Sequence, residues 1–261
     1  MLYKKPLLSQ ILIYQGNNSR AALPSEFTAC IWNFQKSQAR LWREEFRKLS
    51  QISDLFLAQE NRLSPNVLKE MEKTSLCWYG ASGFLSLKGN YPTGVSTGSV
   101  VVPNKVVSKQ GATESFIHIP KMMLATFFPL MNGEQLLVIN VHAVNFTGLK
   151  SFQKNIAAIA ELILNFEGPV LMGGDFNVWN TKRYETLHRM TSQIGLTETV
   201  FSPDNRSRFL GKPVDYVFTR QLNLISCETR QTAGSDHNPL IARFQIENSP
   251  ISHARNMVKY R

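Results

Sequence analysis

The sequence Val170-Leu171-Met172-Gly173-Gly174-Asp175-Phe176-Asn177 joins a short apolar run to a pair of polar side chains. The apolar residues favour a buried strand, and the two glycines allow backbone geometry and close approach that other residues forbid. If the chain stays extended, Asp175 and Asn177 point to the same side, because they lie two residues apart. A carboxylate and a carboxamide aimed together can activate a water molecule and hold a phosphate oxygen. The stretch therefore indicates a strand that ends in a hydrolytic site.

Short apolar runs and turn residues continue on both sides of this stretch. Runs separated by Gly, Pro and Asn predict strands, while helical spacing and capping residues predict helices. The expected strands lie at 27–32, 54–58, 94–102, 115–119, 122–130, 135–144, 169–172, 214–219, 222–228 and 239–246, and the expected helices at 37–50, 65–73, 150–166 and 181–194. This order predicts an α/β fold in which two mixed β-sheets pack face to face with helices outside.

Length and composition set the organisation of the chain. With 261 residues, 43% of them hydrophobic, the chain can bury a substantial core. Residues 27–246 are predicted to form one domain, between an N-terminal arm at 1–26 and a basic C-terminal tail at 247–261. No apolar run is long enough to span a bilayer. Lys4 and Lys5 before a short apolar run faintly resemble an export signal, but a cleavage site is missing.

The cysteines and the weak resemblance of the N-terminus to an export signal both favour the cytoplasm. Cys30, Cys77 and Cys227 are odd in number, widely spaced and without metal-site spacing, which indicates reduced thiols. We therefore expect a cytoplasmic monomer without stable membrane insertion.

The charge balance favours polyanionic partners. The formal net charge is +10 and the sequence pI is about 9.6, which suits nucleic acid, anionic lipid or phosphorylated small molecules. Lys36, Arg40, Arg43 and Arg47 recur at helical spacing on or just before the helix predicted at 37–50. This stripe is either a track for a phosphate backbone or a solvated face beside buried aromatic residues.

Polar side chains recur where the predicted strands end. They are Trp32-Asn33, Gln59-Glu60, His142 with Asn145, Asp175 with Asn177, Asp215, and Ser235-Asp236-His237. Each group alone is a weak signal, because such short combinations arise by chance. Their order along the chain, each beside an apolar strand, is the informative feature.

In this order the chain resembles the endonuclease/exonuclease/phosphatase superfamily, which includes deoxyribonucleases, abasic-site endonucleases, bacterial sphingomyelinases and inositol-phosphate phosphatases. The resemblance covers residues 27–246 and rests on Gly-Asp-Phe-Asn and Ser-Asp-His, with Gln-Glu upstream. The segments at 142–146 and 235–240 are most similar to those of the bacterial YafD-like proteins. The resemblance implies a four-layer α/β sandwich, in agreement with the strand and helix pattern.

The resemblance also implies a metal site and an activated water. Asn33 and Glu60 would hold Mg²⁺, or alternatively Mn²⁺, with Asp236 close to the same ion. Oxygen ligands suit such a hard cation. Asp175 would orient or deprotonate the attacking water. Gln35 stands where the family often has a second acid, which implies weaker metal binding or greater reliance on Glu60.

The remaining implied roles concern the phosphate and the leaving group. Asn177, together with Asn145, would hold a non-bridging phosphate oxygen. His237, oriented by Asp215, would stabilise charge on the phosphate. His142 would act on the leaving-group side. A basic residue that often follows a serine in the family is replaced by Val100, which implies that one phosphate-contacting cation is lost.

Several substrates fit these roles. The leading hypothesis is a Mg²⁺-dependent phosphodiesterase that acts on DNA or RNA, with Arg62 as a candidate to grip a substrate phosphate and Trp179 to line the cleft. Other phosphoesters are the alternatives, through a sphingomyelinase-like or an inositol-phosphate phosphoesterase activity. We expect no exposed aromatic hairpin of the membrane-inserting kind, which weighs against the lipid alternative. A third reading is a catalytically silent binding module.

Overall fold

Two mixed β-sheets face each other across the core. The computed structural model describes residues 11–14, 20–87, 89–113 and 119–247. The seven-stranded sheet has the order β1 (Ile11–Tyr14), β4 (Cys77–Leu85), β5 (Pro92–Ser99), β3 (Leu55–Arg62), β2 (Glu26–Asn33), β15 (Leu240–Ile246), β14 (Leu222–Thr229). The six-stranded sheet has the order β10 (Thr197–Glu198), β13 (Asp215–Arg220), β9 (Val170–Asp175), β8 (Gln135–His142), β7 (Pro120–Pro129), β6 (Lys105–Thr113). A separate hairpin joins β11 (Arg208–Phe209) to β12 (Lys212–Pro213).

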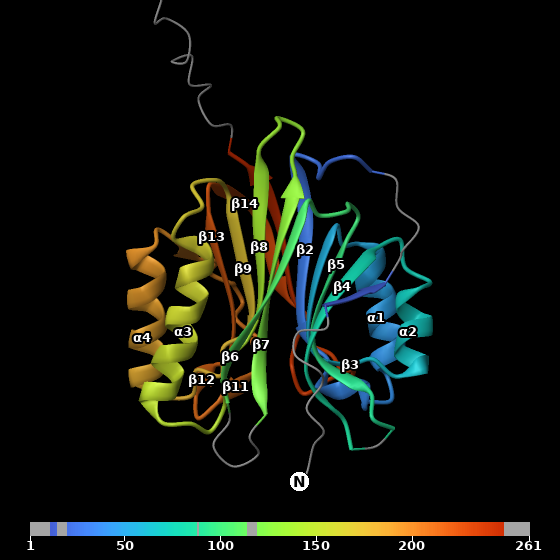
Figure 1. Ribbon diagram of the computed structural model, residues 1–261, viewed down its shortest axis with the longest axis horizontal. Coiled ribbons are helices and arrows are strands. Elements are labelled where there is room, and N and C mark those ends of the chain that lie inside the picture. Colours follow the sequence, from blue (N-terminus) through green and yellow to red (C-terminus); the bar gives the residue numbers. More distant parts are fainter. Residues whose placement is uncertain (1–10, 15–19, 88, 114–118, 248–261) are drawn as a thin grey trace, which may run out of the picture.

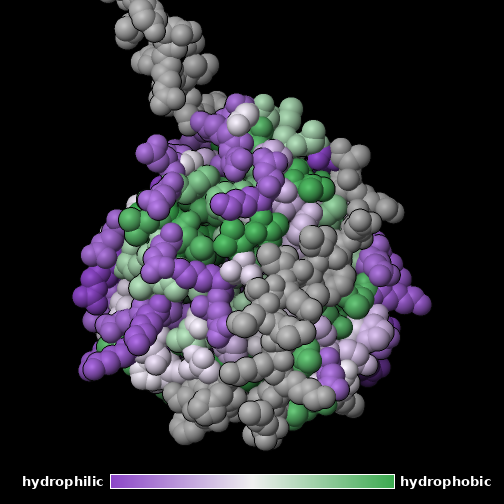
Figure 2. Space-filling model, viewed as in Figure 1, coloured by the Kyte–Doolittle hydropathy of each residue, from purple (hydrophilic) through white to green (hydrophobic). Residues whose placement is uncertain are grey.

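Helices cover the outer face of each sheet. α1 (Trp42–Gln51) and α2 (Pro65–Met71) lie against the first sheet, and α3 (Leu149–Ile163) and α4 (Thr181–Gln193) lie against the second (Figure 1). Hydrophilic side chains cover the flank formed by α3 and α4 (Figure 2). The predicted four-layer α/β sandwich is therefore confirmed. None of the helices in the described ranges has the length and apolarity that crossing a membrane requires.

Local sequence explains most of the helices. In α3, Phe152, Ile156, Ile159 and Ile163 share one buried face, as their spacing predicts. The Ser64 hydroxyl accepts a hydrogen bond from the Val67 N–H and caps α2. These local signals place both helices within a few residues of their predicted bounds.

The first predicted helix begins later than its sequence pattern indicates. A helix was expected over 37–50, but α1 begins at Trp42, after a short 3₁₀ segment at Gln35–Ser37. Gln35, Lys36 and Ser37 have positive φ angles of 46°, 58° and 56°, which no α-helix accommodates. The prediction was therefore wrong at this end, and Lys36 lies off the helix.

Part of the predicted arm belongs to the first sheet. Residues 11–14 form β1, whose apolar, β-prone sequence pairs antiparallel with β4, and the Leu23 N–H donates to the carbonyl of Pro129. Two long strands, β4 and β6, were missed, since the first contains two glycines and the second is rich in polar residues; the two-residue strands β10, β11 and β12 were missed as well. Most of the run predicted at 115–119 and nearly all of the predicted tail at 247–261 lie outside the described residues.

The glycines of β9 allow close contact with β8 in the same sheet and with β2 in the facing sheet. A Cβ atom on Gly174, whose φ is 148°, would lie 1.9 Å from the carbonyl oxygen of Val141 in β8. A Cβ atom on Gly173 would lie 2.8 Å from the Ile31 side chain in the facing sheet. Only glycine fits both positions, so the sequence before Asp175 seats β9 closely between its neighbours.

Candidate active site

Adjacent strand ends bring the predicted site residues together. β8 and β9 run parallel, which places His142 beside Asp175. β13 pairs antiparallel with β9, which places Asp215 on the other side of Asp175. Asn33 ends β2 in the facing sheet, and its Nδ2 donates to Asp175 Oδ2 at 3.0 Å. His237 comes from the loop before β15. Four side chains that are distant in sequence therefore converge on the Asp175 carboxylate.

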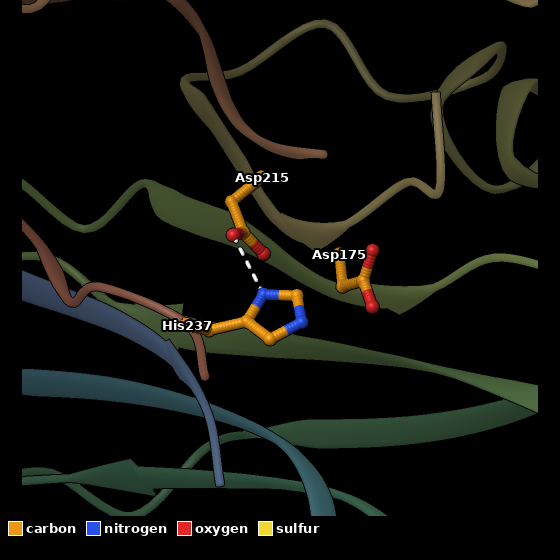
Figure 3. A group of neighbouring side chains, drawn as sticks. All are labelled: Asp175, Asp215 and His237. Atoms are coloured by element: carbon orange, nitrogen blue, oxygen red, sulfur yellow. Dashed lines mark hydrogen bonds and ion pairs between the residues drawn. The ribbon is translucent and has the colours of Figure 1, made fainter. Parts of the chain in front are cut away.

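An acid–histidine pair lies beside Asp175. His237 Nδ1 is 2.7 Å from Asp215 Oδ2, and its second ring nitrogen faces Asp175 (Figure 3). Ligating atoms of these three side chains all lie within 4.8 Å of one another. The Trp32 Nε1–H donates to the His237 carbonyl at 2.8 Å, which holds this loop against β2. The imidazole is therefore fixed by both its backbone and its ring.

Burial and charge set the protonation states in this cluster. Burial raises the pKa of Asp175 to about 7, although the nearby His237 opposes the shift. Burial alone would lower the pKa of His237, but the charge and hydrogen bond of Asp215 raise it to about 10. At neutral pH the site therefore combines a carboxylate close to its pKa with a stable imidazolium.

Both ring nitrogens of His237 are expected to be protonated at about pH 8, because the pKa of the ring lies near 10. The pKa is raised in the folded protein, so the charged ring stabilises the fold fully below its ordinary pKa. That contribution is lost as pH rises through about 10. Side-chain ¹⁵N–¹H NMR measures this state directly, and Asp215→Asn should return the titration toward ordinary values. A neutral His237 ring in the wild type at about pH 8 would contradict this assignment.

The chain turns immediately after Asp175. The extended chain that would point Asp175 and Asn177 to the same side is not present, because Asn177 has a φ of 51° and its N–H donates to Asp175 Oδ1 at 2.9 Å. The Asn177 Nδ2 donates to the carbonyl of Ala143 at 3.0 Å. Both oxygens of Asp175 thus accept hydrogen bonds, which fixes the carboxylate. Asn177 supports Asp175 and retains one side-chain N–H for another acceptor.

A lysine that the sequence pattern did not reveal completes the other side of the site. Lys121 Nζ, in β7, lies 3.0 Å from His142 Nε2. The same ring nitrogen lies 3.6 Å from Asp175 Oδ2 and 3.9 Å from Glu60 Oε1. Burial, followed by the charge of Lys121, lowers the pKa of His142 well below its usual value. The pairing of β7 with β8 brings Lys121 to this position, so only knowledge of that pairing could have identified it. Lys121 supplies a cation at the site, whereas the basic residue that the family often has is replaced by Val100.

A pocket of about 450 Å³ opens beside these side chains. Its polar wall consists of Lys36, Glu60, Arg62, Lys121, His142 and Asn145. Arg62 and Asn145 therefore line the same pocket as His142. By contrast, Asp236 is exposed and outside the Asp175–Asp215–His237 cluster. Trp179 does not line the pocket as predicted, because its ring packs 4.8 Å from the Arg183 guanidinium.

An apolar rim borders the pocket. Phe146, which is 58% exposed, lies 6.0 Å from the Phe209 ring of the β11–β12 hairpin. Phe209 and Leu210 at this hairpin are 43% and 72% exposed. The expectation that no aromatic hairpin is exposed was therefore wrong. The cause is a tight turn with positive φ at Leu210 and Gly211, which directs the apolar residues outward.

Strained backbone is concentrated around the site. Six of the nine non-glycine residues with positive φ in the described ranges are Gln35, Lys36, Ser37, Glu60, Phe146 and Asn177. Such conformations are costly and persist where the surrounding structure holds them. Their position at one end of the sheets supports a functional role for this surface.

The donor set fits a hard divalent cation. Asp175 and Glu60 offer carboxylate oxygens that suit Mg²⁺. Asn33 would offer its amide oxygen after a rotation of the amide, because here its Nδ2 donates to Asp175 and its Oδ1 accepts from the Gln35 N–H. Burial raises the pKa of Asp175, and a nearby cation would favour its charged form. His237 is a poorer ligand, because its Nδ1 is paired with Asp215 and the ring stays protonated. The residues are thus compatible with an ion on the Asn33–Glu60 side of Asp175.

Comparisons with known proteins agree with this geometry. A model of the "Endonuclease/Exonuclease/phosphatase family" matches residues 30–237. A UPF0294 protein of Yersinia enterocolitica is 35% identical over 236 residues, which cover 88% of this chain and 89% of the relative. This relative confirms the resemblance to YafD-like bacterial proteins.

Solved structures share the fold. The endonuclease/exonuclease/phosphatase of Beutenbergia cavernae has a TM-score of 0.71 at 12% identity, and covers 87% of this chain and 73% of its own. The human Nocturnin catalytic domain with a bound sulfate anion has a TM-score of 0.64 at 16% identity, and covers 91% of this chain and 97% of its own. Because the family model matches residues 30–237, the chain belongs to the endonuclease/exonuclease/phosphatase family.

Proposed function

We propose that this protein is a divalent-metal-dependent phosphodiesterase that hydrolyses DNA or RNA. The observation that carries the proposal is the position of Asp175, a buried carboxylate between the His237–Asp215 pair and the His142–Lys121 pair. A phosphodiester is anionic, so an attacking water needs a base on one side and cations around the phosphate oxygens. The site provides both: Asp175 is the base, and His237 and Lys121 are the cations, with Lys121 and His142 on the pocket wall.

Each side chain then has one chemical task. Asp175 accepts the proton of the attacking water, for which a pKa of about 7 is well suited. The His237 imidazolium donates to a phosphate oxygen and stabilises the charge that develops there. Asn33 and Glu60 would hold the divalent cation, which would neutralise phosphate charge when bound.

The leaving group is served by His142 and Lys121 together. His142 is neutral at physiological pH because burial lowers its pKa, so by itself it carries no charge toward a departing alkoxide. The Lys121 ammonium, 3.0 Å away, supplies the positive charge and a proton donor beside the ring. This assigns Lys121 a role that sequence reasoning gave to His142 alone.

The polar and apolar parts of the pocket favour a nucleic-acid substrate. Lys36, Arg62 and Lys121 line the pocket and suit phosphate groups, while the exposed Phe146 ring offers a surface on which a base can stack. A silent binding module has no need for so many buried polar groups, whose burial is costly.

One observation favours a second candidate, the phosphodiester of a lipid head group. The apolar hairpin tip at Phe209 and Leu210 is flanked by Arg208 and Lys212, a combination that also suits an anionic lipid surface.

A panel of phosphoesters separates these candidates. With Mg²⁺, we expect release of products from single-stranded DNA or RNA, and its loss on addition of EDTA. Sphingomyelin in vesicles, an inositol polyphosphate and bis(4-nitrophenyl) phosphate complete the panel. Metal-dependent release of choline phosphate without action on nucleic acid would overturn the substrate assignment. Inactivity toward the whole panel would favour a binding module instead.

A further inference from the structure

We propose that a second groove, beside the catalytic pocket and distinct from it, binds the phosphate backbone of a polynucleotide strand. The inference rests on the proposed function, because it extends the path of the same substrate. The groove has a volume of about 650 Å³ and lies between the segment at 37–44 and the start of α2. Its charged lining consists of Arg40, Arg43, Arg47, Lys48, Arg62 and one acid, Glu44.

The groove and the catalytic pocket share one wall. Arg62 lines both of them. Lys36 lines the catalytic pocket, and its neighbour Ser37 lines the groove. A strand that leaves the pocket past Arg62 therefore enters the groove directly. This continuity distinguishes the groove from a basic patch elsewhere on the surface.

Part of the positive charge of the groove lining is not neutralised by ion pairs within the protein. Arg43 and Arg47 share the buried carboxylate of Glu70, at 3.5 and 2.7 Å. Among the described residues, Arg40 and Arg62 form no ion pair with a carboxylate. Because α1 begins only at Trp42, Arg40 lies before the helix and lines the groove. The basic stripe predicted from the sequence, Lys36, Arg40, Arg43 and Arg47, is therefore not one solvated helical face.

Several polar groups of the lining lack partners. Ser37 Oγ, Trp42 Nε1 and Arg62 Nε are buried atoms without a hydrogen-bond partner in the described structure. Trp42 is only 4% exposed and lines the groove. Buried polar groups normally find partners, so the three unpartnered atoms carry a cost that a small shift of their side chains toward an acceptor in the groove would relieve.

The start of α1 adds to the same preference. This ten-residue helix has no side-chain cap at Leu41, and its first turn lines the groove. The N-terminus of a helix favours anions, because its first N–H groups have no partner within the helix. Glu44 and Glu45 in the first turn of α1 offset part of this preference, so the arginines carry most of the attraction. A concave, cationic groove with unpartnered donors fits a row of phosphates better than it fits a flat lipid surface.

Binding of a labelled single-stranded oligonucleotide of about twelve nucleotides in EDTA tests the groove without catalysis. Arg40→Glu should weaken binding at least about tenfold, whereas the equal charge change Lys154→Glu on α3 should weaken it by less than about twofold. Arg40→Ala should lower the slope of log Kd against log salt concentration by about 0.7. Trp42→Phe keeps an aromatic ring in the core but removes Nε1, and should weaken binding by about threefold. Hydrolysis of bis(4-nitrophenyl) phosphate, which needs only the catalytic pocket, should be unchanged in Arg40→Glu.

The groove and the proposed function fail in different ways. Equal losses of oligonucleotide affinity in Arg40→Glu and Lys154→Glu would show that only net charge acts, and would overturn the groove. If Arg40→Glu abolishes binding to phosphatidylglycerol vesicles but leaves oligonucleotide binding unchanged, the polynucleotide is the wrong ligand. If binding depends on Arg40 but no phosphodiester is hydrolysed with Mg²⁺, the groove stands and the proposed hydrolase activity does not.

Discussion

Asp175→Asn is expected to lower kcat for phosphodiester hydrolysis by about 10³- to 10⁴-fold, because it removes the base that takes the proton from water. Asparagine keeps the shape of the side chain and one oxygen that can accept from Asn33 or Asn177. The substitution therefore leaves the packing around the side chain nearly unchanged but removes its ability to accept a proton. Initial rates with Mg²⁺ and a saturating substrate measure the effect.

The same substitution should make the fold more stable. The pKa of Asp175 is raised by burial, so the folded protein binds this proton more tightly than the unfolded chain. Stability therefore falls as pH rises from the ordinary carboxyl pKa to about 7, and the charged Asp175 remains costly above that. At about pH 8 the variant should melt a few degrees higher than the wild type. Exposed Glu161→Gln on α3 is the matched control and should change neither rate nor melting temperature. A slow variant that also melts much lower would indicate structural damage instead of a lost base.

His237→Asn is expected to lower kcat by about 10²- to 10³-fold, through loss of the cation that stabilises the phosphate. The asparagine Nδ2 can replace His237 Nδ1 as the partner of Asp215, which avoids leaving that buried carboxylate unpaired. The rate loss should therefore come without unfolding, as thermal denaturation would verify.

A second acid–histidine pair provides the control for this variant. His188 lies 3.2 Å from Glu198, and both are outside the pocket. His188→Asn should keep the wild-type rate. Comparable rates in His237→Asn and the wild type would remove His237 from the mechanism.

The sequence predicted the parts of the site that local pattern encodes. The apolar run that ends in Gly-Gly-Asp places Asp175 at the end of one strand, and the apolar run after Ser-Asp-His places His237 just before another, since a buried strand has a recognisable composition. The long helix over 150–166 and the capped helix after Ser64 follow from spacing and capping alone. Two sheets with outer helices then follow from the order of the elements.

Other features depend on contacts between distant residues. Nothing local indicates that Gln35, Lys36 and Ser37 adopt positive φ, because none of them is a residue type that favours it. Their conformation accompanies the packing of Phe34 against Trp42, with ring centroids 5.3 Å apart, and this packing delays the start of α1. Four residues that precede α1, namely Ser37, Ala39, Arg40 and Leu41, line part of the groove.

Lys121 and the apolar hairpin were hidden for the same reason. Lys121 reaches His142 only through the pairing of β7 with β8, which requires the register of two strands. The hairpin strands β11 and β12 have two residues each, which is too short for a periodic pattern. Long-range pairing and tight turns therefore account for the functional residues that sequence reasoning missed.

The most direct test of the central claim is cleavage of one labelled oligonucleotide by the wild type and by Asp175→Asn, each with Mg²⁺ and with EDTA. The account predicts cleavage by the wild type with Mg²⁺ alone, and rates near background in the other three reactions. Equal cleavage by both proteins, or cleavage that survives EDTA, would contradict the assignment of Asp175 as the base of a metal-dependent phosphodiesterase.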